Sequence, residues 1–242
     1  MTDAPTDAPV NQLRRERTTI RPMTAVQPKL VELVQDAVLA EIASGKMPAG
    51  QRIAEQEVAR ELGVPRQAVQ QALAVLRGLG VVCDVPGGGA QVVPLDLDHV
   101  RDMYDMRAVL EGLAFRKAAE RNPRRAALEG PSYIADGRAA VAAGDMERMI
   151  EADMAFHAFI YELSGNPLVG PSMDKHWADT QRVMGEVLIR GERPRDVWDQ
   201  HQALLDAVIA GNADKAEKLA RDHIDQAADI TIERLRQERT AH

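Results

Sequence analysis

The sequence has few aromatic residues, one cysteine and no long apolar run. Phe, Trp and Tyr make up 3% of the 242 residues, whereas apolar residues as a whole make up 45%. This composition favours packed helices over a β-sandwich or barrel, which rely on aromatic and β-branched residues. The lone Cys83 excludes an intramolecular disulfide, and no stretch approaches the roughly 20 apolar residues that cross a bilayer. The N-terminal residues lack the apolar segment of a signal peptide, so we expect a cytoplasmic protein without a membrane partner.

An excess of basic charge is also missing, because the formal net charge is −7. Residues 1–27 carry four arginines against three acids, and residues 28–94 carry six basic and seven acidic groups. The acidic excess therefore lies in the C-terminal region. Any DNA contact by the N-terminal region must come from a local basic cluster, not from the overall field.

Residues 1–27 show no apolar periodicity and are rich in Ala, Pro, Thr and Asp, which predicts a disordered arm. Its basic residues Arg14, Arg15 and Arg17 either contact DNA or belong to a solvated tail.

Residues 28–94 alternate helical and β-prone patterns. Three helical segments are expected at about 30–43, 54–62 and 65–77, with Pro65 suited to a first helical turn. Two short β-prone runs follow, joined by the glycine-rich segment 84–89. This order predicts a winged helix-turn-helix. The glycines lack the GxxxxGK[ST] spacing and lead into a strand, which favours a wing over a phosphate-binding loop.

The third segment presents a polar face with no carboxylate, as a helix inserted into the major groove of DNA requires. Arginine binds guanine or phosphate, and glutamine can read adenine. The other interpretation is a packing helix with a solvated face. We expect the DNA contacts to come from this face, with one residue before the second helix and one at the wing tip: Arg66, Gln67, Gln70, Gln71, Arg52 and Gly88.

After a short linker at 95–98, helical periodicity continues from 99 to 238. Gly, Pro and Asn pairs interrupt it and predict an antiparallel bundle of six or seven helices. The expected breaks lie at 122–123, 130–131, 144–145, 165–167, 191–194 and 211–212.

Four residues of this bundle form a candidate metal site. Asp153 and His157 are one helical turn apart and share a face, while His201 and His223 lie on two further amphipathic segments. Together they offer three nitrogens and one oxygen to a divalent transition metal, with zinc the default and nickel or manganese also acceptable. Any one of these histidines alone would more often be a core or surface residue.

Four protein ligands leave coordination positions open for a small organic acid. Arg107 is the first candidate to hold the acid's distal group, although it also has the spacing of a helix-surface pair with Glu111. Arg148 and Arg182 are further candidates. Two other functions remain open: a metal-dependent, hydrolase-like enzyme and a structural metal domain. The sequence has no HExxH motif to supply a general base, which argues against the enzyme.

The segment PAGQRIAEQEVARELGVPRQAVQQALAVLRGLGVV, followed by GGGAQVV, resembles the GntR family of bacterial regulators. The downstream order of Arg107, Glu111, Asp153-x3-His157, Gly165-Asn166-Pro167, His201 and Asp222-His223 is similar to the FCD ligand-binding domain of the FadR subgroup. The resemblance covers residues from about 28 to 238.

This resemblance implies a transcription regulator, with the quartet as metal ligands and Arg107 facing the effector pocket. Two recognition helices roughly 34 Å apart in a homodimer would read a pseudo-palindromic operator, and we expect a repressor. The sequence departs from the family pattern at Gln70, where Arg is common, at Pro65, where Ser or Thr is common, and in its non-basic wing. Loss of an arginine removes a phosphate or guanine contact, so we expect either an operator that differs from those of common relatives or an affinity that depends on the N-terminal arm.

Overall fold

A computed structural model describes residues 27–188 and 195–241 and confirms the mainly α-helical class, with one small sheet. The basic residues of the expected arm fall within 1–26, and the expected break at 191–194 falls within 189–194; both stretches lie outside the described residues. The elements in chain order are α1 (Pro28–Ala43), β1 (Arg52–Ile53), α2 (Glu55–Glu61), α3 (Arg66–Gly78), β2 (Val82–Asp84), β3 (Ala90–Val92), α4 (Leu97–Arg121), α5 (Pro123–Ala143), α6 (Met146–Ser164), α7 (Val169–Leu188), α8 (Arg195–Ile209) and α9 (Ala213–Ala241).

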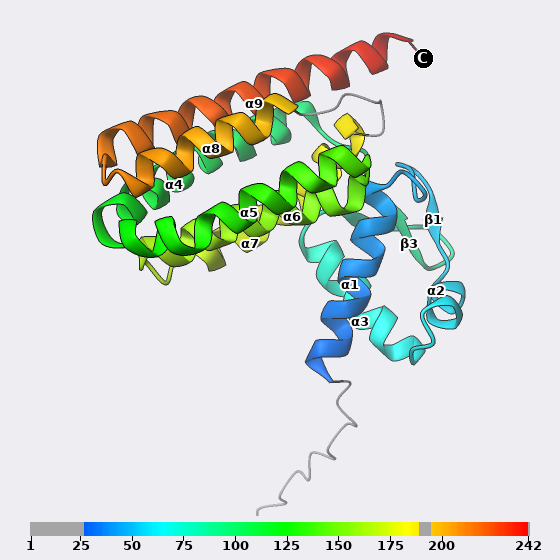
Figure 1. The fold of residues 1–242 in the computed structure, drawn as a ribbon. Helices are drawn as coiled ribbons and strands as arrows, with labels where there is room; N and C mark the ends of the chain where they lie inside the picture. The colour runs from blue at the N-terminus through cyan, green and yellow to red at the C-terminus, as the bar shows by residue number, and fades with distance from the viewer. Residues whose placement is uncertain (1–26, 189–194, 242) are drawn as a thin grey trace, which may run out of the picture.

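The N-terminal module has the predicted order of helices and hairpin (Figure 1). Helix α3 buries one apolar face, including Val69, Leu73 and Leu76, against a core shared with α1 and the sheet. The sheet has three strands in the order β1-β3-β2, because Arg52 and Ile53 pair with Gln91 and Ala90. A two-residue strand has no readable periodicity, which is why only the hairpin was predicted.

Two boundaries differ from the sequence-based expectation. Pro65 is the N-cap of α3 with extended backbone (φ −60°, ψ 137°), so the helix begins at Arg66 and not at the proline. Helix α4 begins at Leu97, inside the expected linker at 95–98. The side chain of Asp96 accepts hydrogen bonds from the amides of Asp98 and His99 and so caps the helix two residues early.

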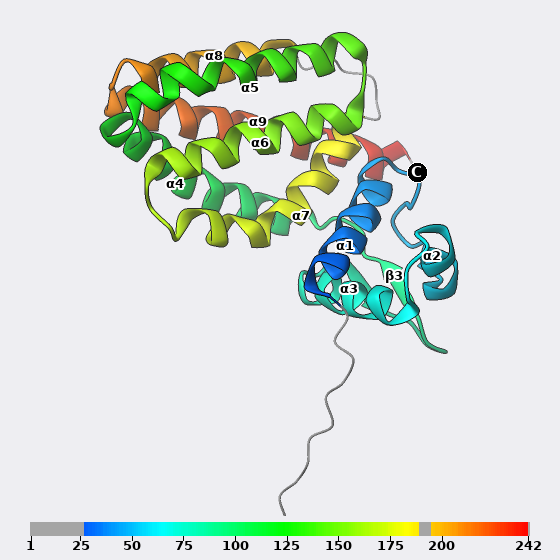
Figure 2. The ribbon, with the colours of Figure 1, turned by 60° about the horizontal axis from the view of Figure 1, so that its bottom comes forward.

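Helices α4–α9 form the predicted antiparallel bundle, and Figures 1 and 2 show the N-terminal module at one end of it. Helix α4 packs most extensively on α9, and α5 packs on α6 and α8. Gly144 (φ 69°) and Gly165 (φ 61°) end α5 and α6 in the left-handed conformation, at two of the expected breaks. In the part of the chain that the structure describes, no helix is long and apolar enough to cross a membrane.

The expected break at Gly130-Pro131 was wrong, because α5 runs without interruption from Pro123 to Ala143. A β-carbon at Gly130 would lie 2.5 Å from the side chain of Leu205. Gly130 therefore allows close packing of α5 against α8, and that packing holds the helix together across the missing amide of Pro131.

Candidate metal and effector site

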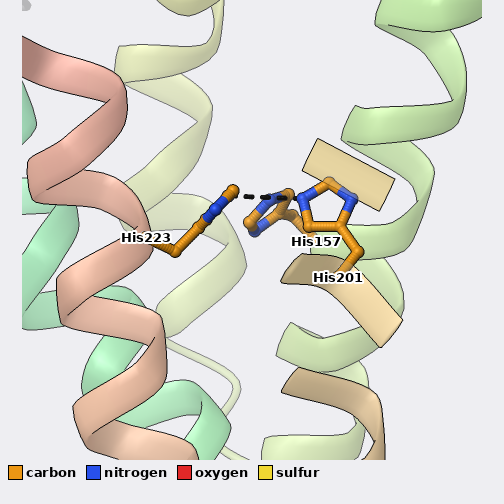
Figure 3. A group of neighbouring side chains, drawn as sticks. All are labelled: His157, His201 and His223. Atoms are coloured by element: carbon orange, nitrogen blue, oxygen red, sulfur yellow. Dashed lines mark hydrogen bonds between the residues drawn. The ribbon is translucent and has the colours of Figure 1, made fainter. Parts of the chain in front are cut away.

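Three histidines from three helices meet in the middle of the bundle (Figure 3). His157 lies on α6, His201 on α8 and His223 on α9, and one ring nitrogen from each lies within 4.8 Å of the others. The Nε2 atoms of His201 and His223 are 3.3 Å apart. His157 and His201 are almost fully buried. The helical spacing predicted that these three histidines face inward, and the fold brings them together from three separate helices.

Asp153, the fourth predicted ligand, lies beside this cluster. It is buried one turn before His157 on α6, and its Oδ1 is 3.5 Å from Nε2 of His201. All four residues of the quartet are therefore brought together by the fold.

The donor atoms fit a divalent cation. In tetrahedral zinc geometry each nitrogen ligand lies about 2.0–2.1 Å from the metal, which places two such ligands about 3.3 Å apart. The Nε2 atoms of His201 and His223 are separated by this same distance, 3.3 Å. Nε2 of His157 is buried without a hydrogen-bond partner, which costs free energy unless something binds it. Imidazole and carboxylate suit zinc, nickel or manganese.

Two residues outside the quartet orient its imidazoles. Oε2 of Glu111 is 2.5 Å from Nδ1 of His157, and Oε1 of Gln200 is 2.6 Å from Nδ1 of His223. When Nδ1 donates to such a partner, Nε2 carries the lone pair and can bind a metal. Sequence reasoning treated Glu111 only as a partner for Arg107, and it missed Gln200, for which helix periodicity gives no signal.

Burial and the carboxylate of Glu111 act on the pKa values of the cluster in opposite directions. Burial lowers the pKa of His223 to about 3 and the pKa of His201 well below its usual value, so both imidazoles are neutral and ready to coordinate. Burial acts to lower the pKa of His157 as well, but the carboxylate of Glu111 outweighs it and raises that pKa. For Glu111, burial is opposed by His157 and Arg107, and its pKa falls to about 2.

A pocket of about 140 Å³ opens beside the cluster and is lined by Arg107, Asp153, His157 and His223 at one end. Arg107 is buried, and its Nε and Nη2 each lie 2.9 Å from Oε1 of Glu111. Arg107 therefore forms the i,i+4 pair in a buried position and not on the helix surface, and it also lines the pocket. Its contact with an acid stays a prediction.

The other two predicted effector-binding arginines lie elsewhere. Arg148 is exposed in the first turn of α6 and does not line this pocket. Arg182 is buried, but it binds Asp179 and the backbone carbonyl of Val93, at the end of the N-terminal module. Helical spacing did not reveal that Arg182 lies on the side of α7 away from the pocket.

Helix α7 joins this site to the N-terminal module. Thr180 on α7 accepts a hydrogen bond from Nη1 of Arg107. Asp179, the preceding residue, contacts His99 near the start of α4 at 2.9 Å. Further along α7, a β-carbon at Gly185 would overlap the carbonyl of Ala43 in the last turn of α1. Helix α7 therefore touches both the pocket arginine and the N-terminal module.

The polar face of α3 is exposed, as a DNA-reading helix requires. Arg66, Gln67 and Gln70 are exposed, whereas Gln71 is half-buried. Oε2 of Glu55 accepts hydrogen bonds from Nε of Arg66 and Nε2 of Gln70, at 2.9 and 3.0 Å. Sequence reasoning missed this carboxylate, which pairs with two of the residues expected to read bases.

At the wing, the guanidinium of Arg52 hydrogen-bonds to the carbonyl of Gly88. Gly88 is exposed with φ 89°, a backbone conformation that favours glycine. Arg52 and Gly88, both expected to contact DNA, are therefore in contact with each other.

Comparisons with known proteins give the family. Residues 30–92 match the model of the bacterial regulatory proteins of the gntR family, and residues 102–226 match the FCD domain. This chain belongs to the GntR family, with a C-terminal FCD domain. Both matched ranges lie within the two modules described above.

Individual relatives agree with this placement. The GntR-family chain is 25% identical, over 79% of its length and 84% of the relative's, to the "Probable D-xylose utilization operon transcriptional repressor" of Paenarthrobacter nicotinovorans. It is 30% identical, over 77% and 78%, to an HTH-type transcriptional regulator of Streptomyces ambofaciens. The solved structure of E. coli McbR/YncC has the same fold, with a TM-score of 0.74, 20% identity and coverage of 84% and 96%.

These matches make the GntR-family chain a transcription regulator and not an enzyme. Regulators of this family bind operator DNA through the helix-turn-helix module, and FCD domains bind small-molecule effectors. The alternative function of a hydrolase-like enzyme is therefore wrong.

Proposed function

We propose that this GntR-family regulator is a homodimeric repressor whose operator affinity depends on a metal and a small organic acid bound in the FCD domain. The observation that carries the proposal is the cluster of buried His157 and His201 with half-buried His223 beside Asp153, which opens into the pocket lined by Arg107. A bound divalent cation would supply a Lewis-acidic centre for a carboxylate. Zinc is the default, with nickel or manganese as alternatives.

Each of the chain's own residues has a part in this proposal. The quartet holds the cation, while Arg107 attracts the acid electrostatically and keeps it in the pocket. The face of α3 with Arg66, Gln67, Gln70 and Gln71 reads bases, and Arg52 and Gly88 position the wing at the DNA backbone. The name of the Paenarthrobacter relative supports a repressor. A cytoplasmic location follows, because the operator is there.

The acid would act on DNA binding through α7. Because Arg107 donates to Thr180 and the neighbouring Asp179 and Arg182 contact His99 and Val93, an acid that moves Arg107 changes the contacts of α7 with the other module. Acid and operator are then coupled through their different affinities for two arrangements of the modules.

The DNA part is tested with Arg66→Ala, using an operator fragment selected from random DNA by the wild-type protein. Loss of a bidentate arginine contact should weaken binding about 5- to 150-fold, or ~1–3 kcal/mol. Arg124→Ala removes the same charge from an exposed position at the start of α5 and should leave binding unchanged. Unchanged affinity and an unchanged salt slope for Arg66→Ala would contradict the docking of α3.

The metal part is tested by elemental analysis of purified protein, with one ion per chain expected. His201→Ala should abolish stoichiometric metal, whereas His99→Ala removes a histidine outside the cluster and should retain it. A purely structural metal is distinguished by thermal shift with carboxylic acids. An effector site predicts stabilisation that chelation removes, and a structural ion predicts no response to acids.

A further inference from the structure

The pocket beside the histidine cluster has two chemically different ends. The polar end consists of Arg107, Asp153, His157 and His223. The rest is lined mainly by apolar side chains from α6–α9, with Trp198 and Ile224 almost fully buried. Among the described residues, the hydroxyl groups of the lining are those of Tyr104 and Thr231, which interact with each other.

The apolar lining follows α9 outward from the cluster. Ile224, Ala227 and Ile230 line the pocket beyond His223, and Ile230 is 44% exposed at its mouth. Seven residues of helix from His223 to Ile230 span about 10 Å. The part of a ligand that extends from the cluster along α9 therefore contacts apolar side chains. No described residue in this part of the lining offers a charge that could bind a second ionised group of the ligand.

The charge of the site also limits the ligand. Arg107 is cationic, Glu111 and a metal-bound Asp153 are anionic, and the coordinating imidazoles are neutral. With a divalent cation the sum is one positive charge, which a single carboxylate neutralises. Since buried charges are costly unless paired, a dianion would leave one charge uncompensated in an apolar pocket.

We infer that the effector is a monocarboxylic acid with an apolar body, alkyl or aryl, and not a hydroxy acid, sugar acid or dicarboxylate. This inference rests on the proposed function, because it names the chemical class for the same site. The cavity of about 140 Å³ is close to the roughly 150 Å³ of an engineered apolar cavity that binds benzene. A body about as large as a phenyl ring or a six-carbon chain therefore fits.

Titration calorimetry of the zinc-loaded protein with a matched series tests the inference. Affinity should rise about fourfold for each methylene from acetate to hexanoate, as expected for burial of a CH2 group. Phenylacetate should bind comparably to hexanoate, whereas lactate and adipate should bind at least tenfold more weakly. Hexanol lacks the carboxylate and should not bind at the same concentrations.

Two variants locate the apolar body in the pocket. Ala227→Phe fills the apolar end and should weaken hexanoate at least tenfold, with acetate affinity and metal content unchanged. Glu233→Phe adds the same ring on the exposed side of α9 and should change neither. If Ala227→Phe does not fold, Ile230→Asn at the exposed mouth serves instead, and should weaken octanoate but not acetate.

The two possible failures are distinguishable. If lactate binds as tightly as hexanoate, or if affinity is flat with chain length, the apolar-body inference is overturned while the effector site stands. If no acid of any length binds the zinc-loaded protein, both the inference and the proposed effector function are overturned.

Discussion

Glu111 is the residue on which the polar end of the pocket depends. It is fully buried and contacts the guanidinium of Arg107 and the imidazole of His157 at once. A buried carboxylate of this kind is stable only because both partners are present, and removal of either leaves an unpaired charge. It also fixes the ring of His157 with Nε2 towards the cluster, as a carboxylate behind a metal-binding histidine does.

Glu111→Gln should lower metal affinity about 10- to 100-fold, the usual effect of changing a partner behind a ligand. The amide keeps the shape but removes the charge that strengthens His157 as a ligand. Competition with a fluorescent zinc chelator measures the affinity. Glu120→Gln makes the same change at an exposed position on α4, and equal affinities for the two variants would show that Glu111 does not support the site.

At the scale of elements, α7 is the helix that meets both modules. Its residue Ala178 is buried in the core of the helix-turn-helix module, and Met173 is buried in the core of the bundle. Thr180, two residues beyond Ala178 on the same helix, contacts the pocket arginine. Close approach to α1 requires that residue 185 have no side chain, because backbone of α1 occupies the space of a β-carbon.

Gly185→Ala should therefore force α7 away from α1. Because the overlapping atom belongs to the backbone and not to a flexible side chain, we expect a loss of about 1–3 kcal/mol in the free energy of unfolding. Urea denaturation measures it. Gly170→Ala on the same helix meets nothing within 4 Å and should be neutral or slightly stabilising. Equal stability of the two variants would rule out tight α1–α7 packing.

At the scale of the whole molecule, a short basic helix must give specific DNA binding in a chain with a net charge of −7. A single α3 contributes few phosphate or base contacts, which is why we propose two copies acting on one duplex. A homodimer with two-fold symmetry would place both recognition helices in successive major grooves on one side of the DNA.

Inserting about five base pairs between the two half-sites should abolish tight binding, because half a helical turn moves one half-site to the opposite side of the DNA. Inserting about ten base pairs restores the side and should recover part of the affinity. Fluorescence anisotropy at constant salt measures each fragment, with light scattering to establish the mass of the complex. Binding that is indifferent to a five-base-pair insertion would contradict the symmetric dimer.

The sequence by itself determined the classes of both modules and the residues of the histidine cluster. Apolar periodicity depends on neighbours three or four residues apart, so it identified the helices and the inward faces of His157, His201 and His223. Only the tertiary structure decided what these residues meet. Gln200, Glu55 and the continuous α5 across Gly130-Pro131 depend on contacts between residues distant in sequence. Contacts between distant residues also explain why Arg107 lines the pocket whereas Arg182 binds the carbonyl of Val93. A local pattern predicts which side of a helix is buried, and packing alone determines what lies against it.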